Sequence, residues 1–318
     1  MARNPHYFSQ LAHIELYSPN VEATVKFCTH LVGLEVSDRD DTSVYLRAWG
    51  DYFHHSLKIT HRDTPGMGHL DWRADSAEAL EDAAQYLESI GAGEGWVEGD
   101  KGHGRAYRFH SPDGHVEEVF WDVVWHKAPE GTQSKFADRP ARNHRRGIAP
   151  RRFDHVTLHS SNYEADRDFY KALGMKNPDE IRLDPPLNKA VGGMFSVGNL
   201  SHDIAVFGER SGRRSVFNHV AYNLDSREEV LLAADWIVES GYELEMGAPT
   251  RHKADEGFFV YVVEPGGNRF EFYAGARLVF APDHGPDIHY LSENPNDAWG
   301  NQMPWKEDGN FKKAHTTV

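Results

Sequence analysis

Residues 251–275 read RHKADEGFFVYVVEPGGNRFEFYAG. An aromatic and β-branched run, the turn cluster PGGN at 265–268 and a second alternating run predict a β-hairpin. In the second strand, alternation places Phe270 and Phe272 on one face and Glu271 on the other. Because an unpaired buried charge is costly, Glu271 needs a partner, which is either an arginine or a metal with further ligands.

The end of this hairpin occurs twice, since PDGHVEEVF at 112–120 aligns with PGGNRFEFY at 265–273. Two further pairs of segments match in the same order. They are AHIELYSPN at 12–20 with DHVTLHSSN at 154–162, and GHLDW at 68–72 with NHVAY at 218–222. Self-similarity at matching separations indicates a tandem duplication.

Each copy alternates strand and helix patterns before its closing hairpin, which predicts an α+β fold of two tandem βαβββ modules. The predicted parts are an N-terminal module at 8–124, a linker at 125–150, a catalytic C-terminal module at 151–275 and a tail at 276–318. The linker is polar and rich in Arg, Pro and Gly, so we expect it to be an extended, solvated connector or an inter-subunit contact. The tail is expected to cover a surface or the mouth of a site, and residues from 311 onward are expected to be disordered.

Composition limits the classes of partner. The 318 residues carry a formal charge of −15, which argues against nucleic acid and anionic membranes. With 39% hydrophobic and 26% charged residues, the chain reads as a soluble globular protein, and no apolar run reaches transmembrane length. Its one cysteine, Cys28, excludes an internal disulfide and fits a cytoplasmic location.

Three candidate ligands occupy strand positions of the second copy: His155, His219 and Glu271. Two imidazoles and one carboxylate on separate strands form a facial triad that leaves open positions on an octahedral metal. This arrangement is typical of non-haem Fe(II).

With these residues in place, residues 11–275 resemble the type I extradiol catechol dioxygenases of the vicinal oxygen chelate superfamily. The resemblance is carried by Asp154-His155, Asn218-His219-Val220, His202-Asp203, Thr250-Arg251-His252, Tyr261 and the PGGNR turn that leads to Glu271. It implies that His155, His219 and Glu271 bind the metal. It also implies that His202 is the acid/base residue and that His252 and Tyr261 hydrogen-bond the substrate hydroxyls.

The implied reaction is Fe(II)- and O2-dependent meta-cleavage of catechol or a substituted catechol to a 2-hydroxymuconic semialdehyde-type product, with Mn(II) as an alternative metal. A homo-oligomer, with a tetramer as the first expectation, is implied in the same way. We expect an apolar site walled by Trp299, Phe195 and Phe258, and a preference for uncharged rings. Arg251 is the one exception that could face a carboxylated substituent.

Two other functions stay open. A glyoxalase-like isomerase or epimerase has the same fold but needs a fourth protein ligand, for which Thr157 and His159 share the strand face of His155. A non-catalytic ligand-binding protein is the second alternative. Retention of His202, His252 and Tyr261 argues against it, because a binder needs no proton-transfer group.

The first copy retains His13, His69 and Glu118 at the positions of the triad, and His55 resembles His202. Arg108, however, stands where the second copy has Tyr261, and Gly99 falls near the position of His252. We therefore predict a non-catalytic first module and leave open whether it binds a second metal.

The register of the second hairpin is ambiguous from sequence. A two- or four-residue closure places Val262 opposite Glu271, whereas a bulge at Gly266-Gly267 brings Tyr261 there.

Overall fold

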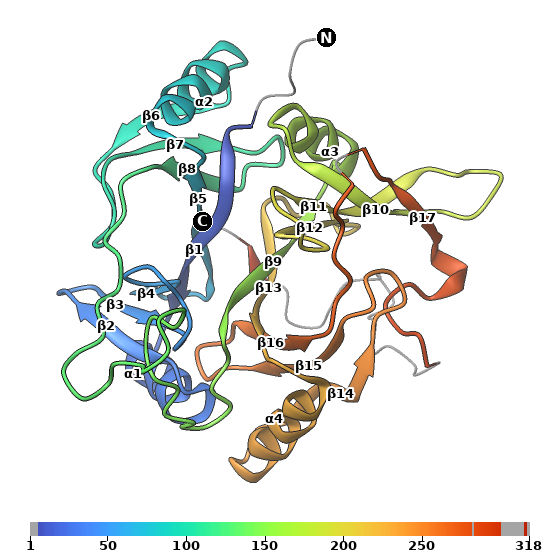
Figure 1. The fold of residues 1–318 in the computed structure, drawn as a ribbon. Coiled ribbons are helices and arrows are strands. Elements are labelled where there is room, and N and C mark those ends of the chain that lie inside the picture. The colour runs from blue at the N-terminus through green and yellow to red at the C-terminus, as the bar shows by residue number, and fades with distance from the viewer. Residues whose placement is uncertain (1–5, 282, 300–314, 317–318) are drawn as a thin grey trace.

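A computed structural model describes residues 6–281, 283–299 and 315–316. Figure 1 shows two modules that lie side by side, each a curved sheet with its helices on the outside. In the part of the chain that is described, no helix is long and apolar enough to cross a membrane. Of the residues from 311 onward that were expected to be disordered, the structure describes only 315–316, which form a strand, and the other residues of that range, together with 300–305 of the tail, lie outside the described residues.

The N-terminal module consists of two βαβββ units. The first comprises β1 (Phe8–Ser18), α1 (Val21–Lys26), the π-helical turn η1 (Phe27–Val32), β2 (Glu35–Arg39), β3 (Ser43–Arg47) and β4 (Leu57–His61). The second comprises β5 (Gly66–Ala74), α2 (Ala77–Ser89), β6 (Gly93–Val97), β7 (Ala106–His110) and β8 (Val116–Phe120).

The C-terminal module repeats this order. Its first unit comprises β9 (Arg152–Ser160), α3 (Tyr163–Ala172), β10 (Lys176–Arg182), β11 (Ala190–Ser196) and β12 (Ile204–Gly208). Its second comprises β13 (Val216–Asn223), α4 (Arg227–Glu239), β14 (Leu244–Arg251), β15 (Phe258–Val263) and β16 (Arg269–Ala274). The tail adds β17 (Asp287–Tyr290), the 3-10 turn η2 (Leu291–Glu293) and β18 (His315–Thr316).

Each module forms one sheet in which the first strands of its two units are neighbours. The strand orders are β2-β3-β4-β1-β5-β8-β7-β6 and β14-β15-β16-β13-β9-β12-β11-β10-β17, with β18 paired to β13. The first strand of each unit runs parallel to the last strand of the same unit, in both modules. The predicted α+β fold of tandem βαβββ modules is therefore confirmed.

The helices α2 and α4 show why equivalent segments fold alike. Ser76 and Ser226 cap them by accepting hydrogen bonds from the backbone N–H groups of Ala79 and Glu229. Each helix then buries an apolar stripe at helical spacing against its sheet. The buried residues are Leu80, Ala83, Ala84 and Leu87 in α2, and Val230, Ala233, Ala234 and Ile237 in α4.

The β15–β16 hairpin closes through a three-residue turn, which settles its register. The backbone N–H of Glu264 donates to the carbonyl of Asn268, and Gly267 takes a φ of +111° between them. Tyr261 consequently pairs with Glu271 with no bulge in the ladder. The three-residue turn places Tyr261 opposite Glu271 without a bulge. Gly267 makes this turn possible because it adopts a positive φ without steric cost.

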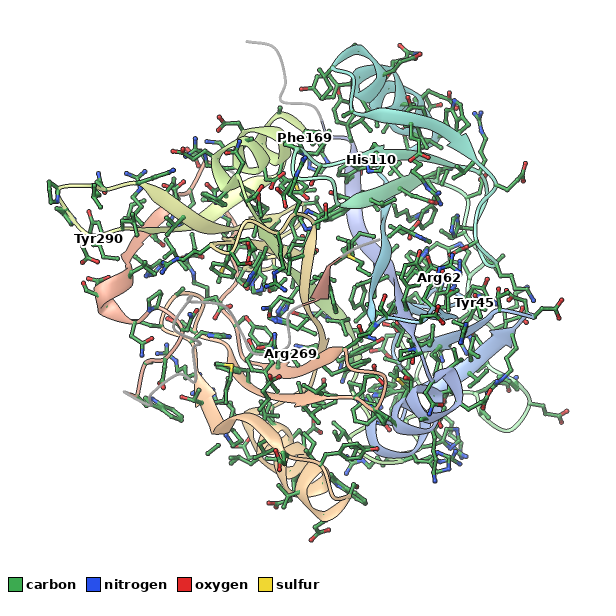
Figure 2. All side chains as sticks on the ribbon, turned by 180° about the vertical axis from the view of Figure 1, so that it is seen from behind. Tyr45, Arg62, His110, Phe169, Arg269 and Tyr290 are labelled. Carbon is green, nitrogen blue, oxygen red and sulfur yellow. The ribbon has the colours of Figure 1, made fainter. Side chains whose placement is uncertain are left out.

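The two modules contact each other through their closing hairpins. Glu264 in the second hairpin accepts a hydrogen bond of 2.6 Å from Thr24 Oγ1 of α1. In the corresponding turn of the first hairpin, two residues beyond the position of Glu264, Asp113 accepts one of 3.1 Å from the Ser161 N–H, just before α3. Figure 2 labels Phe169 of α3 near the edge of the first module, and its ring centroid lies 6.2 Å from that of Phe109.

The connector between the modules was expected to be solvated, but part of it packs against the first module. The N–H groups of Ile148 and Ala149 donate to the carbonyls of Leu31 and Val32 at the end of η1, over 2.9 and 2.8 Å. Ala141 is buried as well. These contacts satisfy carbonyls that the helix end would otherwise leave unpaired, so this part of the linker is docked against the first module.

Candidate metal centre and active site

Three neighbouring strands of the second sheet position the predicted ligands. On β9, β13 and β16, His155, Ala221 and Glu271 form one row across the sheet, and His219 lies two residues before Ala221 on the same face. His155 Nε2 lies 2.9 Å and His219 Nε2 lies 3.2 Å from Glu271 Oε2. The structure therefore brings His155, His219 and Glu271 together, with donor atoms within 4.8 Å of one another.

The donor atoms of this cluster suit a cation. All three side chains are buried, and His219 Nε2 and both Glu271 oxygens have no well-formed hydrogen bond within the described chain. Buried polar atoms are normally satisfied, so atoms left unpaired at one point indicate a missing partner. Two imidazole nitrogens and a carboxylate match the preferences of Fe(II) and Mn(II).

The residue before each histidine holds its ring. His155 Nδ1 donates to Asp154 Oδ2 over 2.9 Å, and His219 Nδ1 donates to Asn218 Oδ1 over 2.6 Å. Each bond leaves Nε2 directed at Glu271, as is usual for metal-binding histidines. Burial alone would raise the pKa of Glu271, but the neighbouring imidazoles hold it well below its usual range. Glu271 is therefore ionised at neutral pH.

His202 lies directly beside the cluster, in the loop before β12. Its ring centroid is 4.0 Å from that of His155, and its Nδ1 is 3.0 Å from Ser201 Oγ. Burial lowers the pKa of His202 to about 3, and His155 adds to the shift. His202 is consequently a neutral imidazole near pH 7, so it can accept a proton.

His252 and Tyr261 approach from the other side. His252 Nδ1 donates to the Asn296 carbonyl over 3.1 Å, which leaves Nε2 at 3.5 Å from Glu271 Oε1. The Tyr261 ring lies 5.0 Å from that of His219, and burial raises the pKa of its hydroxyl well above the usual range. Tyr261 is therefore a hydrogen-bond donor at neutral pH.

These side chains line a cavity of about 530 Å³, a size typical of small-molecule sites. The prediction of the wall residues is wrong, because Trp299, Phe195 and Phe258 do not line the cavity. Arg251 does not line it either. The apolar lining from the sheet and its loops comes from Ile181, Ala190, Val191, Met194, Ala205, Phe207 and Ala254. The tail contributes Leu291, Asn294, Pro295 and Asn296, in agreement with its expected place at the mouth of a site.

Two residues of the site had no assigned role in the sequence reasoning. Asp255 Oδ2 accepts a hydrogen bond of 2.8 Å from the Tyr273 hydroxyl and lies 3.6 Å from His202 Nδ1. Asp255 belongs to the loop before β15, where no periodicity indicates which way a side chain points. The alternation of β16 does place Tyr273 on the face of Glu271, and this was the one available signal.

The first module does not reproduce the triad. Arg108 pairs with Glu118 across β7 and β8, and its Nε and Nη2 donate to Glu118 Oε1 at 2.8 and 2.5 Å. This carboxylate is therefore bound by a guanidinium. Among the described residues, His69 faces Asp71 and Asp100, and Glu118 also lies within 4.8 Å of His69 and Asp71. His55 does take the place expected from His202, since its ring centroid lies 4.3 Å from that of His13.

Comparison with known proteins agrees with this geometry. The model of the Glyoxalase/Bleomycin resistance protein/Dioxygenase superfamily matches residues 10–119 and 152–272. The chain is 38% identical to a metapyrocatechase of Geobacillus stearothermophilus over 92% of this chain and 89% of the relative. It is 39% identical to a manganese-dependent 2,3-dihydroxybiphenyl 1,2-dioxygenase of Geobacillus genomosp. 3, over 87% of this chain and 89% of the relative.

Among solved structures, the 2,3-dioxygenase LapB from Pseudomonas sp. KL28 superposes with a TM-score of 0.81 at 25% identity, covering 90% of this chain and 99% of that one. Homoprotocatechuate 2,3-dioxygenase from Brevibacterium fuscum, in an anaerobic substrate complex, shares the fold with a TM-score of 0.81 at 22% identity, covering 99% of this chain and 98% of that one. The protein belongs to the Glyoxalase/Bleomycin resistance protein/Dioxygenase superfamily and, within it, to the extradiol dioxygenases.

Proposed function

We propose that this protein is an extradiol ring-cleaving dioxygenase that opens catechol or a substituted catechol beside its two hydroxyl groups. The observation that carries the proposal is the convergence of His155, His219 and Glu271 beside the cavity, with His219 Nε2 and both Glu271 oxygens unpaired within the described chain. These three residues would hold Fe(II) or Mn(II). When bound, such a metal acts as a Lewis acid that favours loss of a diol proton, and it leaves open positions for substrate and O2.

The polar residues of the cavity would position the diol. Tyr261 keeps its proton, so its hydroxyl can donate to a deprotonated substrate oxygen and stabilise the charge there. His252 is fixed through Nδ1, which leaves its Nε2 for the second substrate oxygen. Both contacts would orient the ring without a large loss of side-chain freedom, because both groups are already held by the surrounding structure.

His202 would act as the acid/base residue. Its pKa is lowered to about 3 by burial, so the ring is neutral and can accept a proton at Nε2. Ser201 and Asp255 lie near Nδ1 and would stabilise the imidazolium formed in that step. The same proton could then be returned to an oxygen of the opening ring.

The cavity favours an uncharged ring as substrate. Its charged lining residues have both signs, with Lys189 and Arg210 near Glu164 and Glu209. Lys189 Nζ lies 4.0 Å from Glu164 Oε2, so this ammonium is not directed at a substrate carboxylate alone. We therefore propose catechol or alkyl- and halo-catechols as the substrate class.

A glyoxalase-like isomerase is the less favoured alternative. It would require a fourth protein ligand, and the cluster within the described chain contains only His155, His219 and Glu271. His159 is instead engaged by Asn218, whose Nδ2 donates to His159 Nε2 over 3.2 Å.

We also propose a cytoplasmic homo-oligomer, with a tetramer as the first expectation. Helix α4 supports the association, because Leu232 and Trp236 are about half exposed one helical turn apart on its outer face. Size-exclusion chromatography with light scattering tests this state, and a monomer would contradict it.

The deciding experiment mixes metal-loaded protein with catechol, with and without O2, and follows the absorbance of the ring-opened product. We expect a yellow product that forms only with O2. Metal-dependent isomerisation of a 2-oxoaldehyde hemithioacetal without O2 would favour the isomerase. Diol binding without turnover would favour the ligand-binding alternative.

A further inference from the structure

Four donor atoms converge inside the first module. His13 Nε2 lies 2.8 Å and His69 Nε2 lies 3.0 Å from Asp71 Oδ2. Asp100 Oδ2, from the loop between β6 and β7, lies 3.3 Å from His69 Nε2 and 3.8 Å from His13 Nε2. Each imidazole nitrogen thus faces both carboxylate oxygens, and His13, His69 and Asp100 have donor atoms within 4.8 Å of one another, as do His69, Asp71 and Glu118.

These atoms lack ordinary partners in the same way as the ligands of the second module. Within the described chain, His13 Nε2, His69 Nε2, Asp71 Oδ2 and Asp100 Oδ2 form no well-formed hydrogen bond. The two histidines and Asp71 are buried, so bulk water does not reach them as a substitute partner. Buried polar atoms that stay unpaired around one point indicate a missing group, as they do in the second module.

The surrounding contacts hold the donors in place. His69 Nδ1 lies 3.0 Å from Glu15 Oε2, which directs Nε2 toward the cluster. Lys58 Nζ binds the other oxygen of Asp100 at 2.6 Å and also contacts Glu15 at 3.1 Å. The Asp100 N–H donates to His103 Nε2 over 3.1 Å, which fixes the loop. Only Oδ2 of Asp100 therefore remains directed at the histidines.

With neutral imidazoles, the charges of this interior do not balance. Four carboxylates, Glu15, Asp71, Asp100 and Glu118, face two fixed cations, Lys58 and Arg108. Two negative charges remain if both imidazoles are neutral. Burying uncompensated charge is strongly unfavourable, and one divalent cation would remove the excess.

We propose that the first module binds a structural divalent metal through His13, His69, Asp71 and Asp100. The set differs from the one that the repeat indicates, because Asp71 and Asp100 replace Glu118. A closed set of four protein ligands leaves no position for substrate and is typical of structural zinc. The metal would tie β1 and β5 to the β6–β7 loop.

The interior of the first module also explains why this site would not be catalytic. Three large polar residues of the first module occupy positions that are held by small residues in the second module. Two of those small residues line the substrate cavity. The equivalent pairs are Glu15 with Thr157, Lys58 with Ala205, and Asp71 with Ala221. The space that holds a diol in the second module is occupied here by the ligand set and its ion pairs.

Zinc stoichiometry tests the proposal. Apoprotein is loaded with Zn²⁺, desalted and analysed by elemental mass spectrometry. We expect two zinc ions per wild-type chain, one in a His219→Gln/Glu271→Gln variant, and one in an Asp71→Asn/Asp100→Asn variant. Glu118→Gln tests the ligand set, because Glu118 lies near His69 and Asp71 while Arg108 binds only its Oε1; it should keep both ions, and loss of one would contradict the assignment of Asp100 as the fourth ligand.

The His219→Gln/Glu271→Gln variant makes the test independent of mutations in the first module and of ring cleavage. It should lose dioxygenase activity yet retain one zinc, and added Zn²⁺ should raise its Tm. If this variant is folded by circular dichroism and holds no zinc, the proposal is wrong, and two protonated imidazoles balance the carboxylates instead. That result would leave the proposed function of the second module untouched.

Discussion

Tyr170 on α3 donates a hydrogen bond to Glu117 on β8, with 2.7 Å between the hydroxyl and Oε1. Trp72 Nε1 donates to Oε2 over 2.6 Å. Glu117 thus joins its own module to the first helix of the other while it is fully buried. Burial raises its pKa to about 7, even though both donors favour the ionised form.

This pKa predicts that stability decreases as pH rises. The folded state holds a proton on Glu117 up to about pH 7, whereas the unfolded side chain loses it near its ordinary value of 4.5. The folded state therefore binds more protons between these values, and the free energy of unfolding falls by about 3 kcal/mol across them.

Glu117→Gln should remove this contribution, because the amide does not titrate. Urea unfolding of wild type and variant at pH 5 and pH 8 measures the difference. The exposed Glu98→Gln is the control and should follow the wild type. Parallel pH dependence in wild type and Glu117→Gln would contradict the prediction.

Thr24→Val tests the junction at the other hairpin. The substitution keeps the shape of the side chain but removes the hydroxyl that donates to Glu264 Oε2 across the module interface. The carboxylate keeps the backbone donors Gly266 and Asn268, but the variant also loses the 2.8 Å hydrogen bond between the Thr24 hydroxyl and Ser18 Oγ, so the loss of two bonds should cost about 2–4 kcal/mol. Urea unfolding against the exposed control Thr64→Val measures it, and equal stabilities of the two variants would refute it.

Much of the fold and the cluster of the second module follow from sequence because the duplication places equivalent residues on equivalent strands. His155 and His219 lie on strands that the repeat identifies, and strand alternation gives Glu271 the matching face. These are consequences of chain periodicity, which needs no knowledge of loop conformation.

The features that could not be predicted from the sequence depend on loop conformations and on single residue differences between the two repeats. Whether Tyr261 or Val262 faces Glu271 depends on one residue in the turn, and two closures were compatible with PGGN. Asp100 and Asp255 reach their partners from loops. Asp71 occupies the position of Ala221, so comparing the repeats showed a difference there but not that its carboxylate would contact both histidines.

Removing a ligand of the second module should abolish metal binding there and activity together. In His219→Ala or Glu271→Ala, one of three donors is lost, and the remaining pair no longer forms a facial site. We expect loss of tightly bound iron after desalting and loss of catechol cleavage, measured on the same sample. His61→Ala, an exposed histidine on β4, is the control. Full activity in either ligand variant would rule out the triad.

His202→Phe separates proton transfer from binding. The phenyl ring fills the space beside His155 and leaves in place the three proposed ligands and Tyr261 and His252, the groups proposed to position the diol. Loss of an acid/base residue typically lowers the rate by about 10²–10⁴-fold, so kcat should fall while the anaerobic Kd for catechol and the iron content stay near those of the wild type. Ser201→Ala, which only removes a neighbour of Nδ1, should reduce kcat less. If His202→Phe instead weakens catechol binding and leaves kcat unchanged, the residue positions substrate, and the proton must be carried by another group in the cavity.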